Sequence, residues 1–179
     1  CDTHEPSRKA SVNRVVKEGR KEPASYGEKG ELHYQEMLKR DDIDMVVIAT
    51  PWEWHAPIMQ RANQLGMSCF STPFDESAVD FLESLGAPAY KIASFELVDL
   101  PLIRRAAATG KPLIMSTGMA TLEEIDDAVA AAREAGCREL VLLKCTSTYP
   151  ATPENTNIRT IPDLRARFGC LVGLSDHTM

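Results

Sequence analysis

The sequence predicts an α/β protein whose larger part is a section of a parallel (βα)8 barrel, about five βα units long, preceded by a helix–strand piece. Short apolar runs alternate with amphipathic, helix-like stretches, and parallel strands need such crossover connections. The runs begin near residues 67, 89, 112, 140 and 171, and each ends in serine or threonine. A doubly wound sheet fits the same spacing, but polar residues at every strand end favour the barrel, because a doubly wound sheet concentrates its site at one switch point.

The first 57 residues are predicted to hold two helices and one strand. The helices are expected at residues 6–17 and 32–40, with a loop rich in glycine between them. Residues 43–50 form an unbroken, mostly apolar run, which is typical of a strand that is buried on both faces. Pro51 ends this predicted strand.

Further helices are expected between and after the strand-like runs, at residues 57–65, 76–85, 99–110, 121–135 and 161–168. Asp99 can cap the third of these helices through its side chain. Thr121 and Glu124 have the spacing of a capping box, in which the two side chains each accept a backbone N–H. Glycine follows the first, second and fourth of these helices and ends the third at Gly110, and it is a common helix stop.

Composition and charge narrow the class of protein. The chain has 179 residues, of which 44% are hydrophobic and 26% charged, as in a globular protein with a packed core. The net charge of −6 without a basic run argues against a nucleic acid or a membrane surface as partner, and no apolar run approaches the roughly 20 residues of a membrane helix. The five cysteines include no CxxC pair, which favours reduced thiols and a cytoplasmic location. Because the chain starts with cysteine and stops after a polar cluster, we expect a fragment.

The hydroxyl side chains at the strand ends predict a site for a small anion. In a parallel α/β fold the C-terminal ends of the strands open onto one face, so Thr72, Ser94, Ser116 and Ser175 should share a rim with Lys91. Hydroxyl and ammonium groups donate hydrogen bonds to phosphate or carboxylate oxygens. A lysine within a buried run is costly unless it is paired, which favours a role for Lys91 over a snorkelling side chain. The hydroxyls could instead cap the helices that follow, a role compatible with anion binding.

From residue 50 onward, a series of motifs resembles one family. The motifs are Thr-Pro-Trp-Glu-Trp-His, Phe-Ser-Thr-Pro-Phe-Asp, Tyr-Lys-Ile-Ala-Ser-Phe-Glu, Ser-Thr-Gly-Met-Ala, Lys-Cys-Thr-Ser-Thr-Tyr-Pro and Gly-Leu-Ser-Asp-His-Thr, in that order. They resemble the sialic acid (N-acetylneuraminate) synthase family. The Ile-Ala-Ser-Phe-Glu and Cys-Thr-Ser-Thr-Tyr-Pro segments point toward its pseudaminic acid synthase branch.

This resemblance implies a fold, a reaction and a cofactor. The fold is a TIM (βα)8 barrel. The enzyme is a transferase that condenses phosphoenolpyruvate with an N-acetylated hexose, an amino sugar, and forms a nine-carbon 2-keto sugar acid plus phosphate. The family uses a divalent metal, Mn2+ or Mg2+, and the parent enzyme is expected to be a homodimer. We expect the truncated form to be inactive.

Matching motif to motif assigns roles to individual residues. Those that would hold the carboxylate and phosphate of phosphoenolpyruvate are Thr72, Lys91, Ser94, Ser116 and Ser175. Those that would face the sugar are Glu96, Ser147 and Tyr149, and the expected catalytic residues are Lys91 and Glu96. His177 would ligate the metal, although one histidine alone is a poor metal signal.

Residues 1–57 depart from that family. Cys1-Asp2 followed by Pro6, and the run from Asp42 to Pro51, resemble the Rossmann domain of the glucose–fructose oxidoreductase and inositol dehydrogenase family. In that family the residue matching Asp2 meets the cofactor ribose, but the Gly-rich phosphate loop that should precede it is absent. We therefore expect a truncated Rossmann-like segment at residues 1–57, joined to an incomplete synthase-type barrel at residues 58–179.

Two other activities fit parts of the sequence. The first is an NAD(P)-dependent sugar oxidoreductase, which rests on residues 1–57 alone. The second is a Schiff-base aldolase, in which Lys91 would be the nucleophile. Borohydride trapping separates the aldolase from the synthase, because a synthase leaves Lys91 unmodified.

Overall fold

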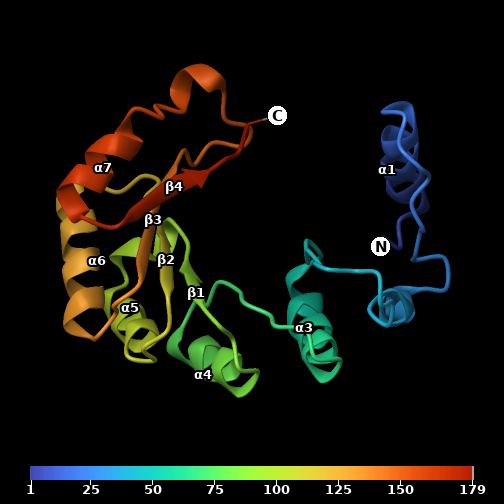
Figure 1. Cartoon of the computed structure of the whole chain (residues 1–179), viewed down its shortest axis with the longest axis horizontal. Coiled ribbons are helices and arrows are strands. Elements are labelled where there is room, and N and C mark those ends of the chain that lie inside the picture. Colours follow the sequence, from blue (N-terminus) through green and yellow to red (C-terminus); the bar gives the residue numbers. More distant parts are fainter. Residues whose placement is uncertain (179) are drawn as a thin grey trace. The chain divides into compact units, whose positions relative to one another are not determined.

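The structure is a computed structural model that describes residues 1–178. It divides into two compact units, Cys1–Met67 and Ser68–Met179, and each is described by itself (Figure 1). In the part of the chain that is described, no helix is long and apolar enough to cross a membrane.

The second unit is built on a parallel sheet, as the alternation of apolar runs and helices predicts. Its strands are β1 (Tyr90–Ile92), β2 (Leu113–Ser116), β3 (Leu140–Cys145) and β4 (Leu171–Ser175). Neighbouring strands follow one another in chain order, β1-β2-β3-β4, and all pairs are parallel. A sheet that always adds the next strand on the same side has the winding of a barrel, because a doubly wound sheet reverses its strand order at a switch point.

Helices cover one face of this sheet, on the side where α4 to α7 lie in Figure 1. They are α4 (Glu76–Ser84), α5 (Leu100–Ala107), α6 (Leu122–Glu134) and α7 (Thr160–Phe168), with short 3-10 turns η3 (Phe95–Val98) and η4 (Pro153–Asn155). Alternate strand residues are fully buried against these helices: Tyr90, Ile92, Leu113, Met115 and Leu142. The period of two along each strand therefore separates a packed face from a half-covered one.

The other face of the sheet carries the side chains that bear on function. In-register partners of parallel strands point to the same side, so this face consists of three rows. The first row is Lys91, Ile114, Val141 and Leu171; the second is Ser116, Leu143 and Gly173; the third is Cys145 and Ser175. The rows progress from apolar residues toward hydroxyl and thiol groups at the C-terminal edge, where the connections to the helices begin.

The helix caps expected from the sequence are confirmed. The Asp99 side chain accepts a hydrogen bond from the N–H of Leu102 at 3.1 Å and so begins α5. Thr121 and Glu124 form the complete capping box of α6, with N···O distances of 3.2 and 2.7 Å. These side chains satisfy N–H groups that have no partner within the helix, which sets where each helix starts.

The expected strand that ends at Ser71 is reduced to a single bridge. Ser71 pairs with Tyr90, and the Ser71 carbonyl accepts the N–H of Lys91 at 3.3 Å, but the residues before it form no ladder. The residue therefore lies beside β1 as a parallel strand would, without the length of one. The sheet therefore has four full strands, whereas the sequence predicts about five. The missing strand is represented only by the bridge of Ser71 to β1.

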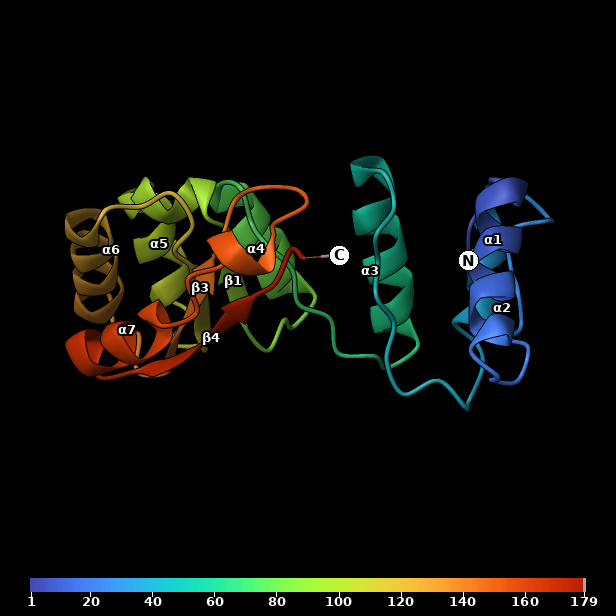
Figure 2. The ribbon, with the colours of Figure 1, turned by 90° about the horizontal axis from the view of Figure 1, so that it is seen from above.

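The first unit is mainly helical and lacks its predicted strand (Figure 2). Its elements are α1 (Glu5–Lys17), η1 (Glu31–His33), α2 (Tyr34–Met37), η2 (Trp52–Trp54) and α3 (His55–Gln64). The prediction of a buried strand at residues 43–50 is wrong, because no strand forms there and Met45 and Val47 are 79% and 77% exposed. An extended segment becomes a strand only beside a partner that takes up its backbone groups, and residues 1–67 contain no other strand. The helix predicted at 32–40 is shortened to η1 and α2.

Candidate functional site

Three connections bring polar side chains together around Gly118. Ser94 follows β1, Gly118 follows β2 and Ser147 follows β3. The N–H of Gly118 donates to Oγ of Ser94 at 3.2 Å. A Cβ atom added to Gly118 would lie 2.4 Å from Oγ of Ser147, 2.9 Å from Oγ of Ser94 and 3.0 Å from Sγ of Cys145. Two hydroxyls and a thiol thus converge at the C-terminal edge of the sheet, as the strand-end pattern predicts for the serines.

Ser116 and Ser175 belong to the half-covered face of the sheet. Ser116 ends β2, and Ser175 ends β4 opposite Cys145. The Ser116 side chain is only 1% exposed, and its Oγ has no hydrogen-bond partner among residues 1–178. A buried hydroxyl without a partner costs about 1–3 kcal/mol. An oxygen of a bound ligand would supply the partner that the described protein groups do not.

Lys91 lies on the same face of the sheet as Ser116. It pairs with Ile114, which is two residues before Ser116, so the lysine stands one row further from the C-terminal edge. The side chain is half-buried, and within the described chain its ammonium makes neither a hydrogen bond nor an ion pair. Its N–H donors are therefore available to an anion that also contacts the hydroxyl rows.

Lys144, the other strand lysine, points to the opposite side. Its register partner Leu174 and its neighbour in alternation, Leu142, belong to the helix-covered face. The ammonium donates to the Cys145 carbonyl at 2.9 Å and to Oγ1 of Thr146 at 2.7 Å. Two lysines in similar apolar runs thus have different surroundings, and only Lys91 faces the hydroxyl rows.

Thr72 and Glu96 are less closely connected to this cluster. Thr72 directly follows the Ser71–Tyr90 bridge and is half-buried. Glu96 lies in η3, two residues after Ser94, and its Oε2 is buried without a hydrogen-bond partner in the described part of the chain. No hydrogen bond between described residues joins either side chain to the serines around Gly118. The predicted substrate-binding roles of Thr72 and Glu96 therefore depend only on the positions of these residues after strand ends.

His177 and Tyr149 meet beyond the ends of β4 and β3. The two rings stack with centroids 4.3 Å apart, and Nε2 of His177 lies 3.4 Å from the Tyr149 hydroxyl. Nδ1 of His177 lies 3.0 Å from the carbonyl oxygen of Thr146. Because a carbonyl can only accept, Nδ1 carries a hydrogen, and in the neutral imidazole Nε2 then keeps its lone pair. This is the arrangement in which a metal-ligating histidine is usually held by its surroundings.

The described residues offer His177 no companions for a complete metal site. No group of three or more histidine, cysteine, aspartate or glutamate side chains gathers in residues 1–178. Asp176, the next acidic neighbour, is turned to Thr178, whose backbone N–H and hydroxyl both donate to its carboxylate. These hydrogen bonds lower the pKa of Asp176 and engage it locally.

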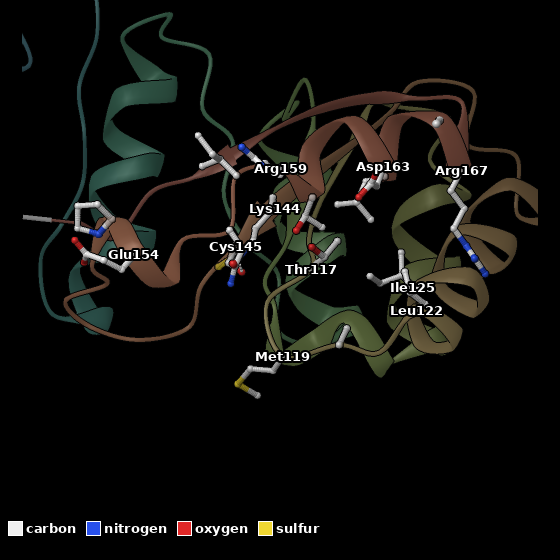
Figure 3. A pocket seen from close by; sticks show the side chains of 17 residues that line it. Thr117, Met119, Leu122, Ile125, Lys144, Cys145, Glu154, Arg159, Asp163 and Arg167 are labelled. Atoms are coloured by element: carbon white, nitrogen blue, oxygen red, sulfur yellow. Dashed lines mark hydrogen bonds between the residues drawn. The ribbon is translucent and has the colours of Figure 1, made fainter.

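A large hollow of about 1160 Å³ lies beside the C-terminal ends of β2 and β3 (Figure 3). It is lined by the ends of β2 and β3 and by α6 and α7, with Thr117, Lys144, Ile125 and Asp163 among its walls. Thr117 and Lys144 alternate with Ser116 and Cys145 along their strands, so they point to the helix side. Cys145 also lines the hollow, whereas Ser94, Ser116 and Ser147 do not, so the hollow meets the cluster around Gly118 at the thiol residue and not at the hydroxyls.

The model of the NeuB family matches residues 14–179. The chain belongs to the NeuB family. This NeuB-family chain is 47% identical over 131 residues to the pseudaminic acid synthase of Helicobacter pylori, an alignment that covers 73% of the chain and 38% of the relative. It is 40% identical to the N,N'-diacetyllegionaminic acid synthase of Legionella pneumophila, covering 71% of the chain and 37% of the relative. The family and its pseudaminic branch, predicted from the ordered motifs, are thereby confirmed.

Solved structures agree with this family and with the predicted barrel. The N-acetylneuraminic acid synthetase of Leptospira borgpetersenii has a TM-score of 0.62 at 30% identity and covers 69% of this NeuB-family chain and 43% of its own. The spore coat polysaccharide biosynthesis protein SpsE of Bacillus subtilis has a TM-score of 0.64 at 27% identity and covers 97% of this chain and 49% of its own. The chain spans less than half the length of these relatives.

The comparisons leave the predicted division of the chain open. The NeuB-family match begins at residue 14, within the segment that resembles an oxidoreductase. The compact units divide after Met67, ten residues later than the predicted boundary at 57. The Rossmann-like segment at 1–57, with Asp2 as a ribose ligand, stays a prediction.

Sequence reasoning missed two residues of the cluster, Gly118 and Cys145. A signal for Gly118 was present, because the glycine directly follows a predicted strand end in Ser-Thr-Gly-Met. Such a position allows another group to approach the backbone closely. Cys145 is buried at 6% exposure. It begins one of the family motifs, but a cysteine at the end of a buried run is by itself an ordinary core thiol.

Proposed function

We propose that this chain is part of a nonulosonic acid synthase, which condenses phosphoenolpyruvate with an N-acetylated hexose to a nine-carbon 2-keto sugar acid and phosphate. The observation that carries the proposal is the face on which Lys91 and Ser116 lie, with Ser94 and Ser147 at its C-terminal edge. The buried, unpartnered Oγ of Ser116 supports a ligand at this face. The names of the relatives, pseudaminic and legionaminic acid synthase, supply the reaction class.

The binding of phosphoenolpyruvate follows from the donors on this face. Lys91 supplies a positive charge, and Ser94, Ser116 and Ser175 supply hydroxyl donors to the carboxylate and phosphate oxygens. Thr72 would add a fifth donor from the Ser71 connection. Because these groups sit on short strands and their ends, they are oriented before the ligand binds, which lowers the reorganisation cost as charge moves onto the leaving phosphate.

The sugar would be held by the residues after β1 and β3. Glu96 presents a buried carboxylate oxygen that has no donor within residues 1–178 and can accept a hydrogen bond from a sugar hydroxyl or amide N–H. Ser147 adds a hydroxyl beside Ser94, and the 74% exposed Tyr149 ring offers an apolar surface to the sugar. In this proposal Lys91 contacts phosphoenolpyruvate and Glu96 contacts the sugar, and the two are the catalytic residues.

A divalent metal fits this proposal through one residue. Nδ1 of His177 donates to the Thr146 carbonyl, which orients the ring and leaves Nε2 as the nitrogen that would coordinate a metal. The Tyr149 hydroxyl, 3.4 Å from Nε2, would have to move away. Mn2+ or Mg2+, when bound, supplies polarisation of the aldehyde oxygen. Substrate oxygens and groups outside the described residues would have to complete the coordination, because His177 is a single donor.

The experiment that tests the proposal measures phosphate release. A protein that contains this chain within a complete barrel is incubated with phosphoenolpyruvate, an N-acetylated hexose and Mn2+, and we expect release only when both substrates are present. Lys91→Met should abolish it. Two results would refute the synthase. One is consumption of phosphoenolpyruvate that does not require a sugar, and the other is that no N-acetylated hexose supports phosphate release.

The same preparation distinguishes the aldolase alternative. Pyruvate and borohydride would trap a Schiff base at Lys91 in an aldolase, whereas the synthase should show no mass increase on the peptide that carries this residue. The inactivity of the 179-residue chain alone, the homodimeric parent and the cytoplasmic location are further proposals. Size-exclusion chromatography of the parent tests the dimer.

A further inference from the structure

Gly118 occupies a position where the backbone itself does not demand glycine. Its φ angle is not among the positive values that most glycines of this chain adopt, so an alanine is conformationally allowed. The surrounding side chains exclude it instead. An added Cβ would come within 2.4 Å of Oγ of Ser147 and 2.9 Å of Oγ of Ser94, far inside the contact distance of about 3.5 Å or more between such atoms.

The backbone of Gly118 also orients Ser94. Its N–H donates to the Ser94 oxygen at 3.2 Å, so that oxygen acts as the acceptor of the pair. The hydroxyl hydrogen of Ser94 then remains available to a further acceptor. An anion on the face of Lys91 and Ser116 is such an acceptor.

We propose that Gly118 is a positioning residue for the anion: its N–H orients the Ser94 hydroxyl, and its missing side chain leaves the space into which the Ser94 and Ser147 hydroxyls and the Cys145 thiol converge. The inference rests on the proposed function, because the anion is the phosphate or carboxylate of phosphoenolpyruvate. Gly118 acts through Ser94 and does not itself need to touch the substrate.

The chain offers a matched control in Gly173. This glycine also lies on the half-covered face and has no positive φ, but a Cβ there would meet only Cδ2 of Leu143 at 3.2 Å. That atom is the end of a flexible side chain and can move aside. Gly173→Ala therefore adds the same methyl group to the same sheet face without disturbing the hydroxyls.

The test uses a protein that contains this chain within a complete barrel. The protein and its variants are titrated with inorganic phosphate and with phosphoenolpyruvate, by calorimetry and by NMR shifts. Gly118→Ala should weaken both affinities about tenfold to a hundredfold, the effect of losing one well-placed hydrogen bond to a charged group. Gly173→Ala should bind as the wild type does. Equal binding by Gly118→Ala, or an equal loss in Gly173→Ala, would overturn the inference.

A double variant separates positioning from a general loss of structure. Ser147→Gly removes the closest of the clashing atoms, so adding Gly118→Ala to it should cost clearly less affinity than Gly118→Ala costs in the wild type. The same pair decides the question if Gly118→Ala alone does not fold. A full loss in the Ser147→Gly background would show that Gly118 does not act through this space and would overturn the inference. No binding by the wild-type complete-barrel protein would instead count against the proposed function.

Discussion

Replacing Ser116 by alanine should change stability and binding in opposite directions. The side chain is 1% exposed, and its Oγ has no hydrogen-bond partner in the described residues, so the ligand-free protein carries the cost of a desolvated hydroxyl. That cost is about 1–3 kcal/mol. Ser116→Ala removes only the oxygen, and we expect it to raise the free energy of unfolding by about 1 kcal/mol, or Tm by about 2–4 °C.

The same oxygen is proposed to donate to the anion, so the variant should bind worse. Loss of one hydrogen bond to a charged group corresponds to about 1.5–3 kcal/mol, or a tenfold to hundredfold weaker affinity for phosphoenolpyruvate. Urea unfolding without ligand and calorimetric titration with ligand measure the two effects on one preparation.

Ser94→Ala is the matched control for this prediction. Its oxygen does have a protein partner, the N–H of Gly118, which the substitution leaves without an acceptor. Ser94→Ala should therefore lower the free energy of unfolding by about 1 kcal/mol while it also weakens binding. If Ser116→Ala destabilised the free protein as Ser94→Ala does, or bound phosphoenolpyruvate as tightly as the wild type, the reasoning about the unpartnered hydroxyl would be wrong.

Three further outcomes test the local physical chemistry. Thr121→Ala should lower the free energy of unfolding by about 1 kcal/mol in urea, because it removes the capping hydroxyl of α6, and Thr121→Ser should restore it. The Glu83 carboxylate accepts a hydrogen bond from the Lys111 ammonium, which lowers the pKa of Glu83 below the usual 4.5. The stability that this contact contributes is therefore present above about pH 4.5 and is lost as the pH falls through the lowered pKa. Glu83→Gln should flatten the pH dependence of the free energy of unfolding in that acid range. Burial raises the pKa of the Cys137 thiol, so mass spectrometry should find the exposed Cys1 alkylated by iodoacetamide long before Cys137; equal rates would contradict the buried position.

The sequence predicted the second unit well, because its signals there are local. Helix starts depend on side chains within one turn, and so Asp99, Thr121 and Glu124 could be assigned as caps from their spacing alone. The alternation of strand and helix also predicted parallel pairing, since crossovers of that length do not suit hairpins.

Predictions that depended on a distant partner were less successful. Residues 43–50 have the composition of a buried strand, but the first unit provides no neighbouring strand, and the segment forms no regular element and leaves Met45 and Val47 exposed. The run that ends at Ser71 keeps only one bridge to Tyr90. Strand propensity reflects how well a residue fits a pleated surface, and it cannot create that surface.

For the candidate site, the amino-acid sequence by itself determined which residue types stand in and after the strands: hydroxyls after each run and a lysine within two of the runs. Only the tertiary structure decided which of them meet. Register places Lys91 on the hydroxyl side and Lys144 on the helix side, because a strand turns successive side chains to opposite faces. It also decided that Ser94 and Ser147 converge on Gly118, since chain segments that far apart in sequence become neighbours only when parallel strands align.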